Sequence, residues 1–171
     1  MSVSARRRVG ASTLAAAALV AVASPAPAAA APPPYDAVFD AGLACAHFDL
    51  GVNFDSQPNT IFREFTDRNG NVVRTINAGK GSDLTFSNAS TAVEVSLKGN
   101  GFVTRTTLNA DGTETVALTG HNVVILFPTD VPAGPTTTLY VGRVVYERSA
   151  EGVFTILSTT GESRDICAEL G

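Results

Sequence analysis

Hydrophobic and polar side chains alternate along much of the chain, with a period of two residues. Between residues 46 and 54 every second position is apolar, ending in Leu50, Val52 and Phe54. Such alternation is typical of a β-strand with one buried face, because successive side chains point to opposite sides of a sheet. No stretch after residue 31 combines a helical period with helical length, and residues 35–42 have room for a single helical turn. The pattern therefore predicts an all-β domain.

Short turn sequences rich in Gly, Asn and Asp interrupt this pattern. Asn69-Gly70 is a strong hairpin signal, because both residues readily adopt the positive φ angles of a tight turn. Similar turns are expected at residues 98–101, 109–112 and 149–152. The alternation and the turns together predict about ten strands, at residues 46–54, 60–67, 71–77, 93–98, 102–108, 113–119, 123–127, 137–147, 153–159 and 162–167.

Tight turns between successive strands indicate an antiparallel meander, in which each strand pairs with the next. An open sheet of about ten strands would have two exposed edges, and closing the sheet into a barrel removes them. We therefore expect a single-domain, closed or nearly closed β-barrel, with a two-sheet β-sandwich as the alternative. Residues 123–127 are apolar on both faces and should lie within a sheet or be covered on both sides.

The N-terminal region has the layout of a secretory signal peptide. Three arginines at residues 6–8 precede an apolar run over residues 14–23, and a stretch rich in proline and alanine follows. The apolar run is shorter than the ~20 residues that span a bilayer. We expect residues 1–31 to be cleaved, residues 32–42 to form a proline-rich N-terminal segment, and residues 43–171 to form the β-domain. The product would be secreted and extracellular, without a stable membrane anchor.

The chain has two cysteines, Cys45 and Cys167. An even number of cysteines in an exported protein indicates a disulfide. The bridge would join the first predicted strand to the last, which fits closure of a barrel. In the chain-entropy model, closing a loop of about 120 residues stabilises the fold by about 4–5 kcal/mol.

An arginine-led leader rich in alanine and proline, followed by a β-rich chain with a cysteine near each end, resembles small secreted β-proteins of high-GC Gram-positive bacteria. The resemblance implies export from a bacterial cell. It carries no catalytic or binding motif, so it implies no particular function.

The charge balance limits the partners. Without the leader, nine basic residues remain against 16 acidic ones, and the formal net charge falls from −4 to −7. A protein that binds nucleic acid needs a basic face that pairs with phosphates. The basic residues of this chain are scattered singly along the sequence, so we expect no nucleic-acid binding.

Motifs for catalysis are absent from the sequence, including nucleophile elbows, metalloprotease helices, phosphate-binding loops and paired-cysteine metal sites. The prediction is no cofactor, no metal and no catalytic residue, and the balance is against an enzyme. His47 and Asp49 would share one face of a strand. Asp67 and Asn69 resemble only a fragment of a calcium loop, which also needs a carboxylate downstream.

The segment around Arg63 presents a conflict. Alternation places Ile61, Arg63 and Phe65 on one face and Phe62 and Glu64 on the other, so each face combines a charge with large apolar groups. A buried charge needs a partner. One hypothesis is that Arg63 points into the barrel and anchors an anionic or polar ligand head. The alternative is that it reaches over the rim or pairs with an acidic neighbour. The predicted ligand-binding residues are Arg63, Phe48, Phe65 and Tyr140.

These observations favour a non-catalytic, secreted binding or interaction domain, whose partner would be an extracellular protein, a cell-wall component or a small molecule. Recognition would lie in loops at one end, especially residues 128–136. One alternative is a small-molecule carrier with the ligand inside the barrel, which requires an interior volume of about 300 Å³ or more. The other is an extracellular hydrolase that uses paired carboxylates.

Overall fold

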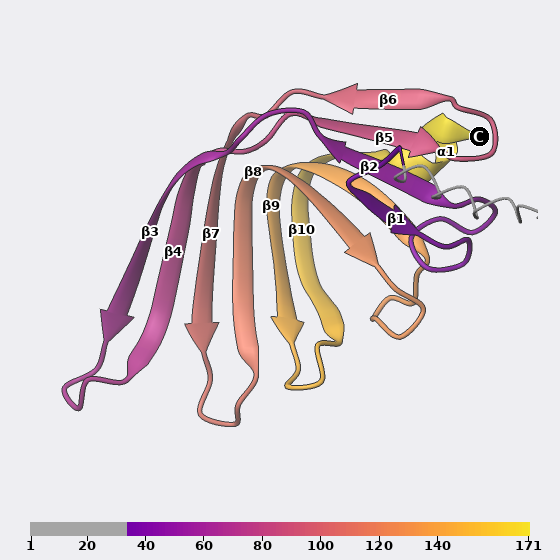
Figure 1. The fold of residues 1–171 in the computed structure, drawn as a ribbon. Helices are drawn as coiled ribbons and strands as arrows, with labels where there is room; N and C mark the ends of the chain where they lie inside the picture. Colours follow the sequence, from indigo (N-terminus) through magenta and orange to yellow (C-terminus); the bar gives the residue numbers. More distant parts are fainter. Residues whose placement is uncertain (1–33) are drawn as a thin grey trace, which may run out of the picture. The chain divides into compact units, whose positions relative to one another are not determined.

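Two antiparallel β-sheets and one short helix make up residues 34–171, the part of the chain that the computed structural model describes (Figure 1). One sheet has four strands in the order β1-β2-β5-β6, and the other has six in the order β10-β9-β8-β7-β4-β3. The all-β class is confirmed. The expected closed barrel is wrong, and the two-sheet alternative fits. The elements are β1 (Ala37–Phe39), β2 (Leu50–Phe54), β3 (Asn59–Thr66), β4 (Val72–Lys80), β5 (Leu84–Asn88), β6 (Glu94–Leu97), β7 (Gly101–Leu108), β8 (Glu114–Leu126), β9 (Thr136–Arg148), β10 (Phe154–Asp165) and α1 (Ile166–Leu170).

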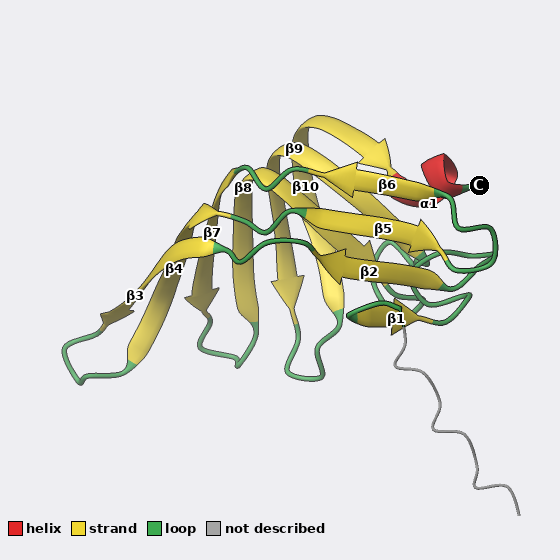
Figure 2. Ribbon diagram, turned by 45° about the horizontal axis from the view of Figure 1, so that its top comes forward, coloured by secondary structure: helices red, strands yellow, loops and turns green. Residues whose placement is uncertain are grey.

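The barrel does not close because the chain passes three times between the sheets without making a hairpin. Strand β2 leads into β3, β4 into β5, and β6 into β7, and the order β2-β5-β6 in one sheet is repeated as β3-β4-β7 in the other (Figures 1 and 2). The expected turn at residues 98–101 is therefore a crossing between sheets. Successive strands also pair as β1–β2, β3–β4 and β5–β6, but an uninterrupted meander is confirmed only for the run from β7 to β10.

Asp83 ties the three crossings together. Its main-chain oxygen accepts a hydrogen bond from the Asp55 amide at 2.9 Å, and its own amide donates to Ser56 Oγ at 2.7 Å. Its carboxylate accepts from the Gly99 amide at 2.7 Å and from Lys98 Nζ at 3.2 Å. One residue therefore satisfies polar groups in all three links, where regular sheet pairing is interrupted.

A row of glycines bends the long strands of the six-stranded sheet. Gly120 of β8 lies opposite Gly142 of β9, and Gly142 lies opposite Gly161 of β10. All three have positive φ angles, of 99°, 152° and 93°, a region that favours glycine. A Cβ atom at any of them would collide with the backbone of a neighbouring strand. The expected break after Gly120 is thus a bend within one continuous strand, β8.

The bend creates two hydrophobic cores. The first lies between the sheets, and Val123 and Ile125 of β8 pack against it. The second lies on the opposite face of β8 and includes Val124 and Leu126. Coverage of residues 123–127 on both sides is therefore confirmed. The buried members of the first core are Ala44, Cys45, Phe48, Leu50, Val52, Phe86, Leu139, Ile166 and Leu170, and those of the second are Val116, Leu118, Val124, Leu126 and Val144.

The predicted disulfide between Cys45 and Cys167 is confirmed, with the two Cα atoms 5.5 Å apart. It does not join the first strand to the last, as expected. Cys45 lies in the irregular segment before β2, and Cys167 lies in α1. The expected final strand ends early because the Asp165 side chain accepts a hydrogen bond from the Ala168 amide at 3.0 Å and caps the helix.

Two further differences concern the N-terminal part. Residues 37–39 form strand β1 rather than a helical turn, because Asp36 and Asn53 each accept a hydrogen bond from the backbone of the opposite segment. The expected signal peptide at residues 1–31 lies outside the described part of the chain. Among residues 34–171, no helix has the length and hydropathy required to cross a membrane.

Candidate binding face

The hairpin ends of the six-stranded sheet project beyond the four-stranded sheet (Figure 2). We call this part, on the hairpin side of the glycine row, the open half. Strand pairing decides which side chains share a face there, because directly paired residues point to the same side. One face is defined by Arg63, by the residues paired with it across the strands, and by every second residue along each of those strands. This arginine face consists of Ile61, Arg63, Phe65, Arg74, Ile76, Ala78, Val103, Arg105, Thr107, Thr115, Ala117, Thr119, Arg143, Val145, Glu147, Thr155, Ser158 and Thr160.

The sheet gathers arginines that are far apart in the sequence. Arg63 of β3 lies opposite Ile76 of β4, which lies opposite Arg105 of β7. Two strand spacings separate the two arginines, or roughly 10 Å. On the same face, Arg74 lies two residues from Ile76 along β4. Arg143 of β9 also lies on this face, two strands away from β7. Four of the nine basic residues that are scattered singly in the sequence therefore lie together on one face.

These four arginines have no carboxylate partner. Within residues 34–171, the ion pairs are Lys98–Asp83, Arg148–Glu114 and Arg164–Glu169. Arg63, Arg105 and Arg143 are exposed. Arg74 is half-buried, its guanidinium carbon lies 4.3 Å from the centre of the Phe65 ring, and its Nε atom has no hydrogen-bond partner. The face thus presents unneutralised positive charge on a floor of apolar and hydroxyl side chains.

Large apolar side chains accompany the arginines in solvent. Ile61 is 65% exposed and Val103 is 41% exposed, and they flank Ala78 in one row of paired residues. On the opposite face of the same edge strand, Phe62 is 60% exposed. Exposed apolar groups that lie together mark interaction surfaces, and arginine is enriched at such surfaces. Strand β3 also pairs on one side only, with β4.

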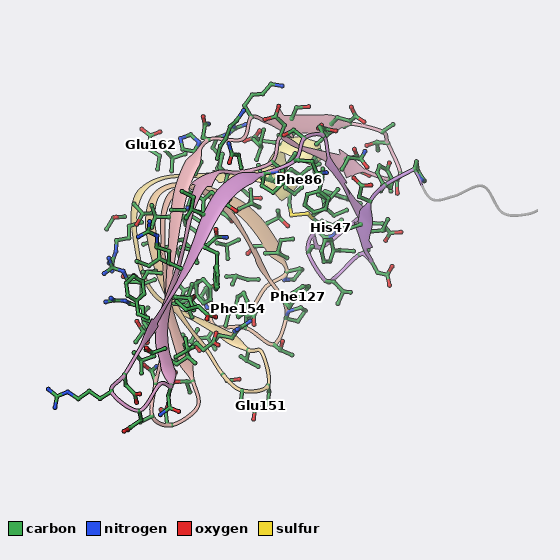
Figure 3. All side chains as sticks on the ribbon, turned by 60° about the vertical axis from the view of Figure 1, so that its left-hand side comes forward. His47, Phe86, Phe127, Glu151, Phe154 and Glu162 are labelled. Carbon is green, nitrogen blue, oxygen red and sulfur yellow. A yellow bond between two sulfur atoms is a disulfide. The ribbon has the colours of Figure 1, made fainter. Side chains whose placement is uncertain are left out.

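The other face of the open half is closed near β8–β10. Phe127 and Phe154 project from that side, and long side chains tipped with nitrogen lie on the opposite side (Figure 3). The carboxylate of buried Asp130 accepts hydrogen bonds from the Phe127 amide at 2.6 Å and the Phe154 amide at 2.8 Å. The link between β8 and β9, expected to carry recognition, is thereby fastened over the second core.

The structure separates the four predicted ligand-binding residues. Arg63 and Phe65 share a face, as the alternation predicted, but no barrel interior exists for Arg63 to enter and its side chain is exposed. Phe48 is buried in the first core, and Tyr140 packs half-buried against the second. Arg74, Arg105 and Arg143 were not predicted from the sequence as binding residues. Alternation shows which residues of one strand share a face. Only the pairing between strands shows that the faces carrying these arginines form one surface.

The two aspartates considered for chemistry accept hydrogen bonds from the backbone. Asp49 Oδ1 accepts a hydrogen bond from the Ala41 amide at 2.8 Å, while His47 is exposed in the segment before β2 (Figure 3). Asp67 Oδ1 accepts from the Asn69 and Asn71 amides at 2.8 and 2.9 Å. Hydrogen bonds from Asn71 hold the Asp67 pKa below its ordinary value. In the described chain, no three His, Cys, Asp or Glu side chains come close enough to hold a metal ion.

Comparison with known proteins identifies no relative. The chain matches no family model, no curated protein and no solved structure. Since a fold alone does not determine a function, the function has to be argued from the geometry of the candidate site.

Proposed function

We propose that the protein is a non-catalytic, secreted interaction domain that binds an acidic segment of a protein partner on its arginine face. The observation that carries this proposal is the cluster of four arginines without carboxylate partners, next to exposed Ile61 and Val103. The expected leader and the disulfide favour a function outside the cell.

Charge complementarity favours an acidic partner. Sixteen acidic residues give the chain a net negative charge, so a local positive face stands out against the rest of the surface. Arginine forms bidentate hydrogen bonds with carboxylates, and such bonds strengthen when apolar neighbours exclude water. Glu147 is the one carboxylate that strand pairing places on this face.

The apolar part of the face favours a protein over an anionic polymer. Ile61 and Val103 offer apolar contact area that a chain of phosphates would not use, whereas a peptide can supply apolar side chains between its carboxylates. The one-sided pairing of β3 adds a second mode of contact. An extended peptide can pair with such an edge and place its side chains on the arginine face.

The test is capture of proteins from culture medium on the immobilised protein, with identification by mass spectrometry. The informative variant is Arg63→Gln with Arg105→Gln, and the control is Lys98→Gln with Arg164→Gln, which removes the same charge from outside the face. Losing two charge-assisted hydrogen bonds, each worth roughly 1.5–3 kcal/mol, should weaken binding at least tenfold. Binding to the wild type and control should also weaken as salt rises.

Two outcomes would contradict the proposal. The first is a captured protein that the arginine variant retains as well as the control does. The second is binding of inorganic polyphosphate, through Arg63 and Arg105, without binding of a glutamate-rich peptide that also carries leucine. That result would identify the partner as an anionic polymer.

A further inference from the structure

Two adjoining cavities lie in the gap between the two sheets, and a third adjoins them, lined apart from Phe39 by β8, the link after it, β9 and β10. The first has a volume of about 320 Å³, the second about 170 Å³ and the third about 330 Å³. Val123 of β8 lines all three. The first and second also share Leu84, and the second and third share Phe39 and Ile125. We call this passage the inter-sheet cleft.

The cleft has an apolar floor that runs from its first cavity into its second. Leu84 and Leu97 of the four-stranded sheet face Val123 and Val141 of the six-stranded sheet there. All four are only half-buried, although they pack against the first core. All the side chains that line the second cavity are apolar, and Phe86 is one of them. Apolar side chains between the sheets therefore remain partly exposed, and covering them with an apolar group would be favourable.

The mouth of the first cavity is polar and rich in hydrogen-bond donors. Lys98, Asn100, His121 and Arg164 line it, and Asn100 Nδ2 lies 3.1 Å from His121 Nδ1. Lys98 donates one bond, to Asp83, and Arg164 pairs with Glu169 through Nε and Nη2. An ammonium has three donors and a guanidinium five, so both retain free donors.

We propose that the inter-sheet cleft binds a small amphiphile, a medium-chain carboxylate, with its tail between the sheets and its head at Lys98 and Arg164. The tail replaces the missing apolar contacts along Val123, and the head accepts hydrogen bonds from donors that Asp83 and Glu169 leave free. The side chains differ from those of the arginine face, so this site does not depend on the proposed function.

The first test is calorimetric titration of the purified protein with hexanoate, octanoate and decanoate. Affinity should rise about fourfold for each methylene that enters the cleft. Affinities that do not change with chain length, or no binding by any of the three, would overturn the proposal.

The second test locates the head and the tail. Lys98→Gln with Arg164→Gln should weaken decanoate binding at least tenfold and leave decanol binding unchanged, because the alcohol carries no charge. Arg63→Gln with Arg105→Gln should leave both unchanged. Val123→Phe, which fills the passage, should abolish binding of both ligands. If that variant fails to fold, the charge variants still decide: equal weakening by the two double substitutions would place the carboxylate outside the cleft.

Discussion

Gly120 and Gly142 lie directly opposite each other in β8 and β9, and both have positive φ angles. Their pairing places the bends of the two strands side by side, and Gly161 of β10 extends the same line. On one side of this line the sheet packs beneath the four-stranded sheet and forms the floor of the inter-sheet cleft. On the other side it continues as the open half. Both candidate sites therefore depend on the same row of residues.

Substitution of Gly120 should destabilise the fold far more than substitution of a turn glycine with a similar backbone. Gly112 has a φ of 86° and open space where a Cβ would lie, whereas a Cβ at Gly120 would collide with the main-chain oxygen of Gly101. Gly112→Ala should cost about 1–2 kcal/mol from the left-handed conformation alone. Gly120→Ala should cost about 1–3 kcal/mol more, from the steric clash. Denaturant unfolding measures both, and equal losses would show that the bend tolerates a side chain.

Asp130→Ala should release the link between β8 and β9. The buried carboxylate accepts hydrogen bonds from the Phe127 and Phe154 amides, and Val131 then pairs with β10 through bonds of 2.7 and 2.8 Å. Loss of these charge-assisted bonds should lower the free energy of unfolding by about 2–4 kcal/mol. Hydrogen exchange should accelerate at the amides of Val131 and Ile156. Thr129→Ala, in the same link but exposed, is the control, and matching exchange in both variants would refute the role of Asp130.

Reduction of the disulfide should destabilise the protein without changing its fold. The bridge spans 122 residues, and Cys45 is fully buried in the first core. The chain-entropy model gives a loss of about 4–5 kcal/mol. Cys45→Ala with Cys167→Ala should unfold at the same lower denaturant concentration as the reduced wild type and should no longer respond to reductant. A wild type that unfolds identically with and without reductant would contradict the assignment.

Local signals in the sequence located three of the hairpins, but not the crossing at residues 98–101 or the bends. Gly70, Gly112 and Gly152 have φ angles of 88°, 86° and 87° in the expected turns. Gly120 also has a positive φ, yet the chain does not reverse there. A glycine permits either outcome, and pairing with distant strands decides between them. The same non-local pairing decided that the sheets would not close into a barrel.

Strand β5 and the arginine face show two further limits. In β5, Ser87 and Asn88 are buried together with Phe86, so the segment lacks the alternation that predicts a strand. For the arginine face, alternation within β3 correctly placed Arg63 and Phe65 on one side. The register of β4, β7 and β9 could not be derived from the sequence, so the neighbouring arginines were not foreseen.

Acid should weaken the crossings between the sheets through Asp83. Its hydrogen bond from the Gly99 amide, followed by that from Lys98, holds the Asp83 pKa below its ordinary value of 3.8. A carboxyl group with a lowered pKa in the folded state stabilises the fold at pH values above 3.8, and this contribution is lost as the pH falls towards the lower folded-state pKa. Stability should therefore decrease below about pH 4, and Asp83→Asn should decrease less steeply over that range because its amide does not titrate.

The matched control for this pH dependence is Asp40→Asn. The Asp40 side chain makes no hydrogen bond or ion pair with any residue from 34 to 171, whereas the Asp83 carboxylate joins its own crossing, between β4 and β5, to the crossing between β6 and β7. The control should keep the acid dependence of the wild type, and at neutral pH Asp83→Asn should be the less stable variant. Measurement of the free energy of unfolding from pH 3 to pH 7 tests both points. If Asp83→Asn and the wild type lost stability in parallel as the pH fell, the carboxylate of Asp83 would not be the group that links the crossings to pH.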